Sequence, residues 1–163
     1  GERLLLENGE DSALLAFLQL ASVPGEYPNA TAVNFMNELE LVGYELAPRR
    51  ANAGETVTLR LYVQALRPLP TDYTFFAQVL DEDTTRWASL DLGQPTSTWL
   101  PDEVQIVEMP LAIAADTPAN VYPLILGVYT RTEDGGFQRL QLVTGDGRIT
   151  QDDVLTLTKI RVD

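Results

Sequence analysis

The sequence lacks histidine and cysteine altogether and contains a single lysine, Lys159, among its 163 residues. Without cysteine there is no disulfide and no thiolate to act as a nucleophile or metal ligand. Without histidine the most frequent catalytic base and a common zinc ligand are also missing. These absences argue against a hydrolytic triad and a zinc site. We therefore expect no catalytic residue, no metal and no cofactor, and we predict that this chain is not an enzyme.

The charge balance is strongly acidic, with 24 acidic residues against 11 basic ones and a net charge of −13. Nucleic acids present a dense row of phosphates that lysine and arginine must neutralise, so we expect no nucleic-acid partner. A glycosidase would need a pair of carboxylic acids. With so many acidic residues such pairs arise by coincidence, and no pair is distinguished by its spacing in the sequence. The longest apolar run, residues 13–23, is shorter than the roughly 18–20 residues that span a bilayer. We expect no direct membrane insertion by this segment.

Residues 1–34 are predicted to form an N-terminal element that is separate from the rest. The pair Asn8-Gly9 favours a hairpin. The competing prediction is a short helix, because Ser12 is a good N-cap in front of an alanine- and leucine-rich run. Pro24 and Pro28 then indicate a connector.

Residues 35–163 are predicted to form one β-sandwich domain. From about Leu39 to Val162 the chain shows eight strand-like runs that are divided by turn residues. The clearest run, residues 56–65, alternates apolar and polar side chains, which is typical of a strand with one face in a core and the other in water. Strands at this spacing, without a convincing helix, indicate an all-β, antiparallel sandwich of the immunoglobulin-like or jelly-roll kind.

Three further details of the strands can be predicted. Residues 73–80 are apolar on both faces, which indicates a central strand. In the last run, Leu155 and Leu157 are out of phase with Ile160 and Val162, so we expect a β-bulge near Thr158. Pro110 and Pro123 cannot donate a ladder hydrogen bond and should lie at an edge, a bulge or a strand end.

The aromatic side chains provide the best candidates for a binding site. Sugars stack their apolar faces on exposed tryptophan and tyrosine rings, and Trp99, Tyr62 and Trp87 are the candidate glycan contacts. Tyr62 falls on the polar face of its strand, and Trp99 lies in a loop before Pro101, so we expect both to be exposed. The alternative is that the aromatic rings fill the core, and that Tyr122 forms a bond like that of a tyrosine corner.

Two acidic segments resemble calcium loops without meeting their requirements. Residues 145–153 resemble the second half of an EF-hand loop, but Leu142 and Thr144 stand where the first two acidic ligands belong. This segment is therefore predicted to be a plain loop between the last two strands. The cluster around Asp81 and Asp83, together with Asp91, is better explained by turn residues that cap their own backbone than by a calcium site.

Several weak motifs occur in the same order as in a known family. They are the segments 39–46 (LELVGYEL), 53–62, 72–81, 87–96, 99–103 (WLPDE), 122–129 (YPLILGVY) and 153–162. This order resembles the β-sandwich at the C-terminus of large bacterial multi-pass membrane proteins that are similar to lipid-phosphosugar-dependent, protein-mannosyltransferase-type glycosyltransferases. The resemblance covers roughly residues 35–163. It departs from the family where Val63, and not tryptophan, follows Tyr62.

The resemblance implies an accessory role, because the transferase chemistry of such proteins is thought to lie in their membrane part. We therefore expect a non-catalytic, extracytoplasmic domain of a cell-envelope or membrane-anchored bacterial protein, which binds glycan or protein or acts as a spacer that positions an active site. The alternative is a structural or adhesion module that acts through contacts with another protein, for example by strand addition at an exposed sheet edge. The sequence does not predict an oligomeric state.

Overall fold

The computed structural model describes residues 27–163, which form an all-β fold. The strands are β1 (Val33–Phe35), β2 (Leu39–Ala47), β3 (Arg50–Ala51), β4 (Thr56–Ala65), β5 (Thr74–Leu80), β6 (Arg86–Gly93), β7 (Val104–Ala112), β8 (Asn120–Arg131), β9 (Phe137–Arg139), β10 (Leu142–Val143) and β11 (Leu155–Val162). One 3-10 turn, η1 (Thr96–Thr98), precedes β7. The predicted N-terminal hairpin or helix lies outside the described residues, and β1 spans the predicted boundary between residues 34 and 35.

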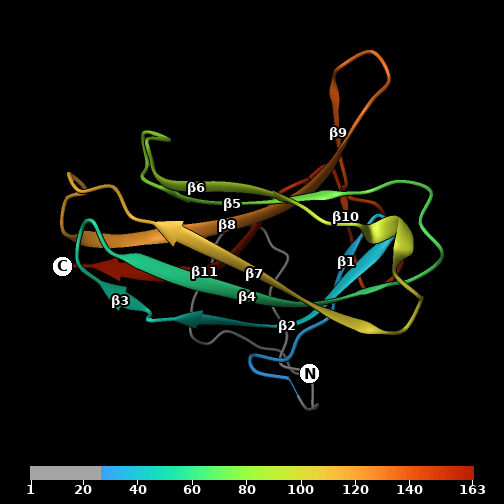
Figure 1. The fold of residues 1–163 in the computed structure, drawn as a ribbon, viewed down its shortest axis with the longest axis horizontal. Coiled ribbons are helices and arrows are strands. Elements are labelled where there is room, and N and C mark those ends of the chain that lie inside the picture. Colours follow the sequence, from blue (N-terminus) through green and yellow to red (C-terminus); the bar gives the residue numbers. More distant parts are fainter. Residues whose placement is uncertain (1–26) are drawn as a thin grey trace.

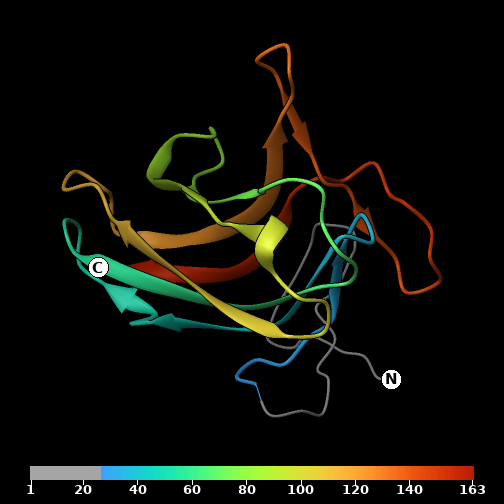
Figure 2. The ribbon, with the colours of Figure 1, turned by 45° about the vertical axis from the view of Figure 1, so that its right-hand side comes forward.

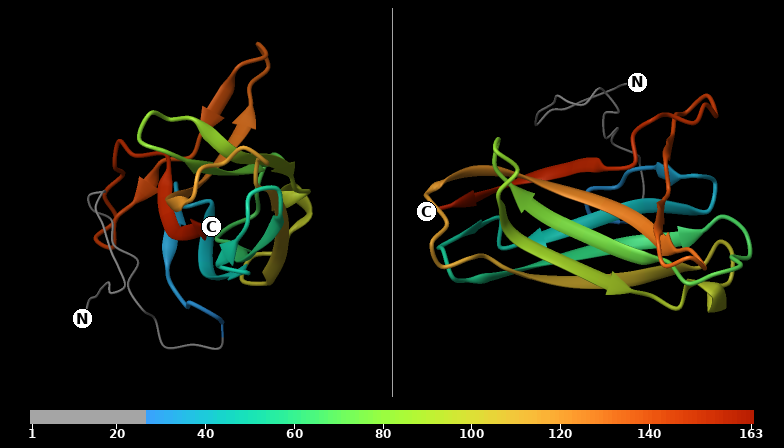
Figure 3. Two further views of the ribbon diagram at one scale, coloured as in Figure 1. Left: turned by 90° about the vertical axis from the view of Figure 1, so that its left-hand side faces the viewer. Right: turned by 90° about the horizontal axis from the view of Figure 1, so that it is seen from above.

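The strands form two sheets that pack face to face, as Figure 1 and the end-on view in Figure 3 show. One sheet has the order β10-β1-β2-β4-β7, and the other has the order β3-β11-β8-β5-β6, with β9 paired to the end of β8. Every strand pair is antiparallel apart from the short parallel pair of β3 and β11. The predicted antiparallel β-sandwich is confirmed, and the structure adds the short strands β1 and β3 to the predicted runs.

The core lies between the two sheets and is built by period-two alternation. In β4 the residues Val57, Leu59, Leu61, Val63 and Ala65 are all buried, whereas the residues between them face outward. The opposite sheet contributes the inward residues of β5, β8 and β11, among them Phe75, Leu124, Leu126 and Leu155. Strand β5 lies between β8 and β6, so the prediction of a central strand is confirmed.

Three ladders shift register at a β-bulge or irregularity: β11 with β8, β2 with β4, and β5 with β6, the last between Val79 and Leu80. The ladder of β11 and β8 shifts between Thr156 and Thr158, as predicted from the leucine pattern. A second bulge shifts the ladder of β2 and β4 between Leu41 and Gly43. Before this bulge, Leu39 and Leu41 point into the core. After it Tyr44 and Leu46 do so, because a bulge inserts one extra residue into the strand.

The run predicted as one strand over residues 137–143 is two strands in different sheets, so this prediction is wrong. Strand β9 pairs with the end of β8, whereas β10 pairs with β1 in the opposite sheet. The chain crosses between the sheets at Leu140 and Gln141. The backbone N–H of the buried Leu140 still donates to the carbonyl of Val128 in β8, whereas the carbonyl of Gln141 accepts from the backbone N–H of Met36, next to β1. Figure 2 shows the β8–β9 ribbon standing off the body of the sandwich.

Two residues singled out in the sequence have the structural roles expected of them. The hydroxyl of Tyr122 donates to the carbonyl oxygen of Pro118 at 2.6 Å, as in a tyrosine corner. Pro110 lies in β7, which is an edge strand of its sheet. Residues 144–153 form the predicted loop between the last two strands, with Gly147 at a positive φ of 88°.

Candidate functional site

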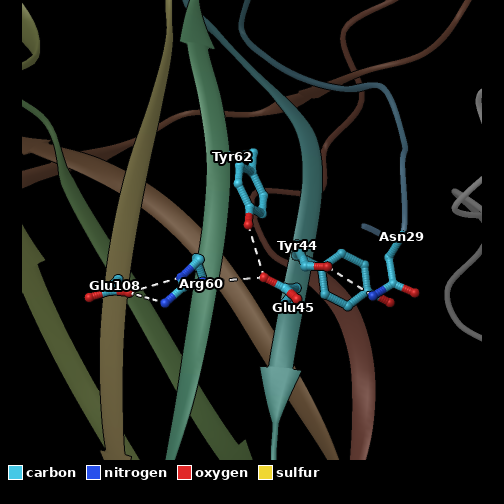
Figure 4. Close-up of polar contacts among 6 residues, drawn as sticks. All are labelled: Asn29, Tyr44, Glu45, Arg60, Tyr62 and Glu108. Carbon is cyan, nitrogen blue, oxygen red and sulfur yellow. Dashed lines mark hydrogen bonds and ion pairs between the residues drawn. The ribbon is translucent and has the colours of Figure 1, made fainter. Parts of the chain in front are cut away.

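Tyr62 lies on the outer face of the β2-β4-β7 sheet, half-buried among polar side chains (Figure 4). In the ladder it stands opposite Gly43 of β2 and Ile106 of β7. Its hydroxyl donates a hydrogen bond to Oε1 of Glu45 at 2.9 Å. One side of the phenol is therefore fixed by a carboxylate.

Arg60, two residues before Tyr62 on the same face, joins the strands on both sides. Its Nε donates to Oε2 of Glu108 in β7 at 2.8 Å, and its Nη1 lies 3.5 Å from Oε1 of Glu45 in β2. The hydrogen bond from Arg60 to Glu108 raises the pKa of the guanidinium, so the charge is kept. The three side chains remain between 42% and 53% exposed, and their outer edges face solvent.

Tyr27 adds a second ring beside Tyr62. The two ring centroids are 5.4 Å apart, and the ring planes are tilted by 39°. The segment that carries Tyr27 is held to β2, because Pro28 O accepts from the backbone N–H of Tyr44 and the amide of Asn29 donates to Tyr44 O. Gly43 makes room for this segment, since a Cβ there would lie 2.7 Å from both Tyr27 Cβ and Pro28 O.

We call these five residues the Tyr62 face: Tyr27, Glu45, Arg60, Tyr62 and Glu108. The face combines two rings with fixed hydrogen-bond acceptors and one multidentate donor. At its margin the amide of Gln64 donates to Glu40 Oε1 at 2.8 Å, and Ile106 is 58% exposed. An apolar ring surface bordered by fixed donors and acceptors suits a polyhydroxylated ligand.

Trp99 is not exposed, so this prediction is wrong. Only 8% of the residue is accessible, and its ring lies in the core with the centroid 6.3 Å from that of Phe75. The turn η1 folds the loop inward, because the fully buried Thr96 accepts from the backbone N–H of Tyr73 and donates to the carbonyl of Thr71. A loop that is anchored in this way directs its next ring into the sandwich.

Trp87 lies on β6 of the other sheet, far from Tyr62 in the topology, and packs partly against the core. Its indole Nε1 donates to Oδ2 of Asp81 at 3.0 Å. The other oxygen of Asp81 accepts from the backbone N–H groups of Asp83 and Thr85, both at 2.9 Å. Asp81 thus caps its own turn, and the structure does not bring Trp87, Trp99 and Tyr62 together.

These contacts predict an acid-sensitive contribution of Asp81 to stability. Partial desolvation raises the pKa of Asp81, but hydrogen bonds from Thr85, Trp87 and Asp83 outweigh it, and the net shift is downward from 3.8. A carboxyl group whose pKa is lower in the native state than in the unfolded state stabilises the fold at pH values above its unfolded-state pKa. This contribution is lost as the pH falls through the native-state pKa. Asp81→Asn should therefore lower the free energy of unfolding at pH 7, and the difference from wild type should shrink below pH 3.8.

Urea unfolding at a series of pH values from neutral to strongly acidic measures this difference. The matched control is Asp83→Asn, because the carboxylate of Asp83 forms no hydrogen bond or ion pair within residues 27–163. A deficit of Asp81→Asn that stays constant over the whole pH range would contradict the assigned role of the Asp81 carboxylate.

Within residues 27–163, no group of three or more acidic side chains is arranged to hold a metal ion. Asp91, which the sequence places near the acidic turn, accepts from the hydroxyl of Tyr129 at 2.7 Å. The described part of the chain also contains no helix with the length and apolar character that crossing a bilayer requires.

Comparison with known proteins identifies no family for this chain. No protein-family model matches the sequence, and no curated protein matches it. Among solved structures, the C-terminal domain of Wzt is similar, with a TM-score of 0.44 and 11% identity, over 79% of this chain and 83% of that one. A likeness of this degree carries no argument about function, and the family that the sequence resembles stays a prediction.

Proposed function

We propose that this chain provides a non-catalytic, extracytoplasmic accessory domain of a bacterial cell-envelope protein, and that it binds glycan on the Tyr62 face. The observation that carries this proposal is the environment of Tyr62. Its half-buried ring lies beside that of Tyr27, and its hydroxyl and the neighbouring guanidinium share one carboxylate oxygen, Oε1 of Glu45. Such preset polar groups fix the orientation of a sugar, while the rings take its apolar face.

The same geometry supports a binding role in preference to hydrolysis. A glycosidase needs one carboxyl group that is free to give a proton and a second that acts as a base or nucleophile. On the Tyr62 face both carboxylates, Glu45 and Glu108, are ion-paired with Arg60. They are arranged as fixed hydrogen-bond acceptors.

The extracytoplasmic location is supported by the resemblance of the sequence to domains appended to envelope glycosyltransferases. It is checked in the intact bacterium by protease added from outside, which should cleave the protein without lysis of the cells. Protection from the protease until lysis would contradict the location and would leave the glycan-binding proposal to its own test.

Binding is tested on an array of bacterial envelope polysaccharide fragments, followed by titration calorimetry with the best binder. We expect Tyr62→Ala to weaken the affinity by about tenfold or more, equivalent to at least about 1.4 kcal/mol. Tyr62→Phe should lose less, because it keeps the ring and removes only the hydroxyl that bonds Glu45.

The control variant is Thr56→Ala, an exposed position on the same face of β4, six residues and roughly 20 Å along the strand. Its affinity should equal that of wild type. Equal affinities for Tyr62→Ala and wild type, with the fold intact, would rule out the Tyr62 face as the binding site.

Protein contact is the second candidate function, and the edge strand β7 favours it. β7 has nine residues, pairs in its sheet with β4 alone and presents the exposed Ile106. Edge strands of this kind accept a further strand from a partner. Self-association that Ile106→Glu abolishes, without binding to any fragment on the array, would support this function in place of glycan binding.

A further inference from the structure

A second cluster of aromatic and charged side chains lies on the opposite sheet, where β8 and β9 leave the sandwich as a two-stranded ribbon. Tyr129 stands opposite Arg139 in the ladder, and Arg131 stands opposite Phe137. Alternate residues of a strand share a face, so these four side chains lie on one face of the ribbon. Figure 2 shows that the ribbon projects from the body of the fold.

The four side chains contact one another in a defined way. The rings of Tyr129 and Phe137 meet edge to face with centroids 5.1 Å apart, and the guanidinium carbon of Arg131 lies 5.1 Å from the Phe137 centroid. Tyr129 also donates its hydroxyl to Asp91 Oδ2 at 2.7 Å, which ties the ribbon to β6. Burial, followed by the hydrogen bond to Asp91, raises the pKa of Tyr129, so this hydroxyl stays protonated and keeps donating.

Arg139 continues the cluster onto the sheet. Its guanidinium carbon lies 4.9 Å from the centroid of the Phe76 ring, which is itself buried against Gly127. A guanidinium stacked on a ring keeps its in-plane N–H groups available at its edge. One of these approaches Asp153 at 3.7 Å, and the side chain of Arg139 remains 48% exposed.

The cluster has two features that a structural role does not require. Phe137 is 62% exposed in β9, whose other two residues, Gln138 and Arg139, are polar. Within residues 27–163 the side chain of Arg131 forms no hydrogen bond and no ion pair, although the chain carries 24 acidic residues. An exposed ring and an unpaired guanidinium side by side offer stacking and charge-assisted hydrogen bonds to one ligand.

We propose that the ribbon cluster, formed by Asp91, Tyr129, Arg131, Phe137 and Arg139, is a second binding site that takes an acidic sugar residue. Phe137 stacks against the apolar face of the sugar, and the guanidinium of Arg131 binds its carboxylate, with Arg139 as the second donor. Asp91 accepts from a sugar hydroxyl with the oxygen that Tyr129 leaves free. This site lies on the opposite sheet from the Tyr62 face and is independent of the function proposed for that face.

The site is tested by titration calorimetry with tetramers of galacturonate, glucuronate and mannuronate, each compared with its methyl ester. We expect at least one acid tetramer to bind, and its ester, which keeps the sugar but loses the charge, to bind about tenfold more weakly. Arg131→Gln and Phe137→Ala should each weaken the binding of the acid by about tenfold.

Two control variants define the site. Gln138→Ala lies on the other face of the same ribbon, and Tyr62→Ala removes the ring of the Tyr62 face; both should bind the acid tetramer like wild type. Melting temperatures within about 2 °C of wild type show that the variants at exposed positions of the ribbon are folded.

The proposal is overturned if none of the three tetramers binds, if the esters bind as well as the acids, or if Arg131→Gln has no effect. Loss of binding in Tyr62→Ala would show that the acidic ligand binds on the Tyr62 face, and would also overturn the proposal. A dimer that is seen in sedimentation velocity and is dissociated by Phe137→Ala would show that the ribbon binds a second copy of the chain. This result would overturn the proposal as well.

Discussion

Replacement of Trp99 by alanine is expected to lower the free energy of unfolding by about 3–5 kcal/mol, the range found for large aromatic residues deleted from cores. The ring of Trp99 is 8% exposed and packs near Phe75 between the two sheets. Its removal leaves a cavity that the anchored η1 turn cannot close, because Thr96 is fixed by hydrogen bonds to residues 71 and 73. Urea unfolding followed by the far-ultraviolet circular dichroism signal measures the change.

Two controls separate core packing from loop exposure. Leu100→Ala alters the next residue, which is 60% exposed, and should change the free energy of unfolding by no more than about 0.5 kcal/mol. Trp99→Phe keeps an aromatic ring in the core and should lose clearly less than the alanine variant. A Trp99→Ala protein as stable as Leu100→Ala would contradict the buried position of this ring.

Gly127→Ala is expected to be the second severely destabilising change, with a loss of about 2–3 kcal/mol. A Cβ at this position would lie 2.2 Å from Cζ and 2.4 Å from Cε1 of Phe76, far inside contact distance. The Phe76 ring, now 3% exposed, must then leave its place beside Arg139 and Tyr129. The loss of stability arises from overpacking, because the Phe76 ring packs directly on the backbone of Gly127 and leaves no room for a Cβ.

The matched control is Gly93→Ala in β6 of the same sheet. The nearest atom to a Cβ there is Thr74 Oγ1 at 3.7 Å, an ordinary contact, so stability should stay within about 0.5 kcal/mol of wild type. The double variant Gly127→Ala with Phe76→Ala offers an internal test. If the ring causes the strain, the alanine at 127 should cost much less once Phe76 is absent.

The fold could be predicted in most of its parts because alternation within a strand is a local property of the sequence. Residues 56–65 show this pattern without interruption, and the bulge near Thr158 follows from one change of phase among four apolar residues. The division of residues 137–143 between two sheets could not be found in this way. It depends on where Leu140 is buried, which is decided by contacts with distant segments.

The candidate site was predicted only at Tyr62, which alternation places on the outer face of β4. Its partners Glu45 and Glu108 come from neighbouring strands, and their approach to Arg60 depends on the register of two ladders. A signal for Glu45 was nevertheless present. Leu39 and Leu41 are out of phase with Tyr44 and Leu46, just as in β11, and the bulge that this implies turns Glu45 outward. For Trp99, exposure was inferred from its position in a loop, which does not distinguish a free loop from one anchored by Thr96.

The bulge in β2 has a consequence for any alignment of this chain with a relative. Because side chains alternate along a strand, one extra residue exchanges the inward and outward positions of everything that follows it. A homologous strand without the bulge should therefore align with a one-residue gap at Val42. Aligned without that gap, Tyr44 and Leu46, which lie in the core, would be matched with outward residues, and Glu45 with an apolar one. Placing the gap from the sheet register, and not from residue identity, keeps both halves of the strand comparable.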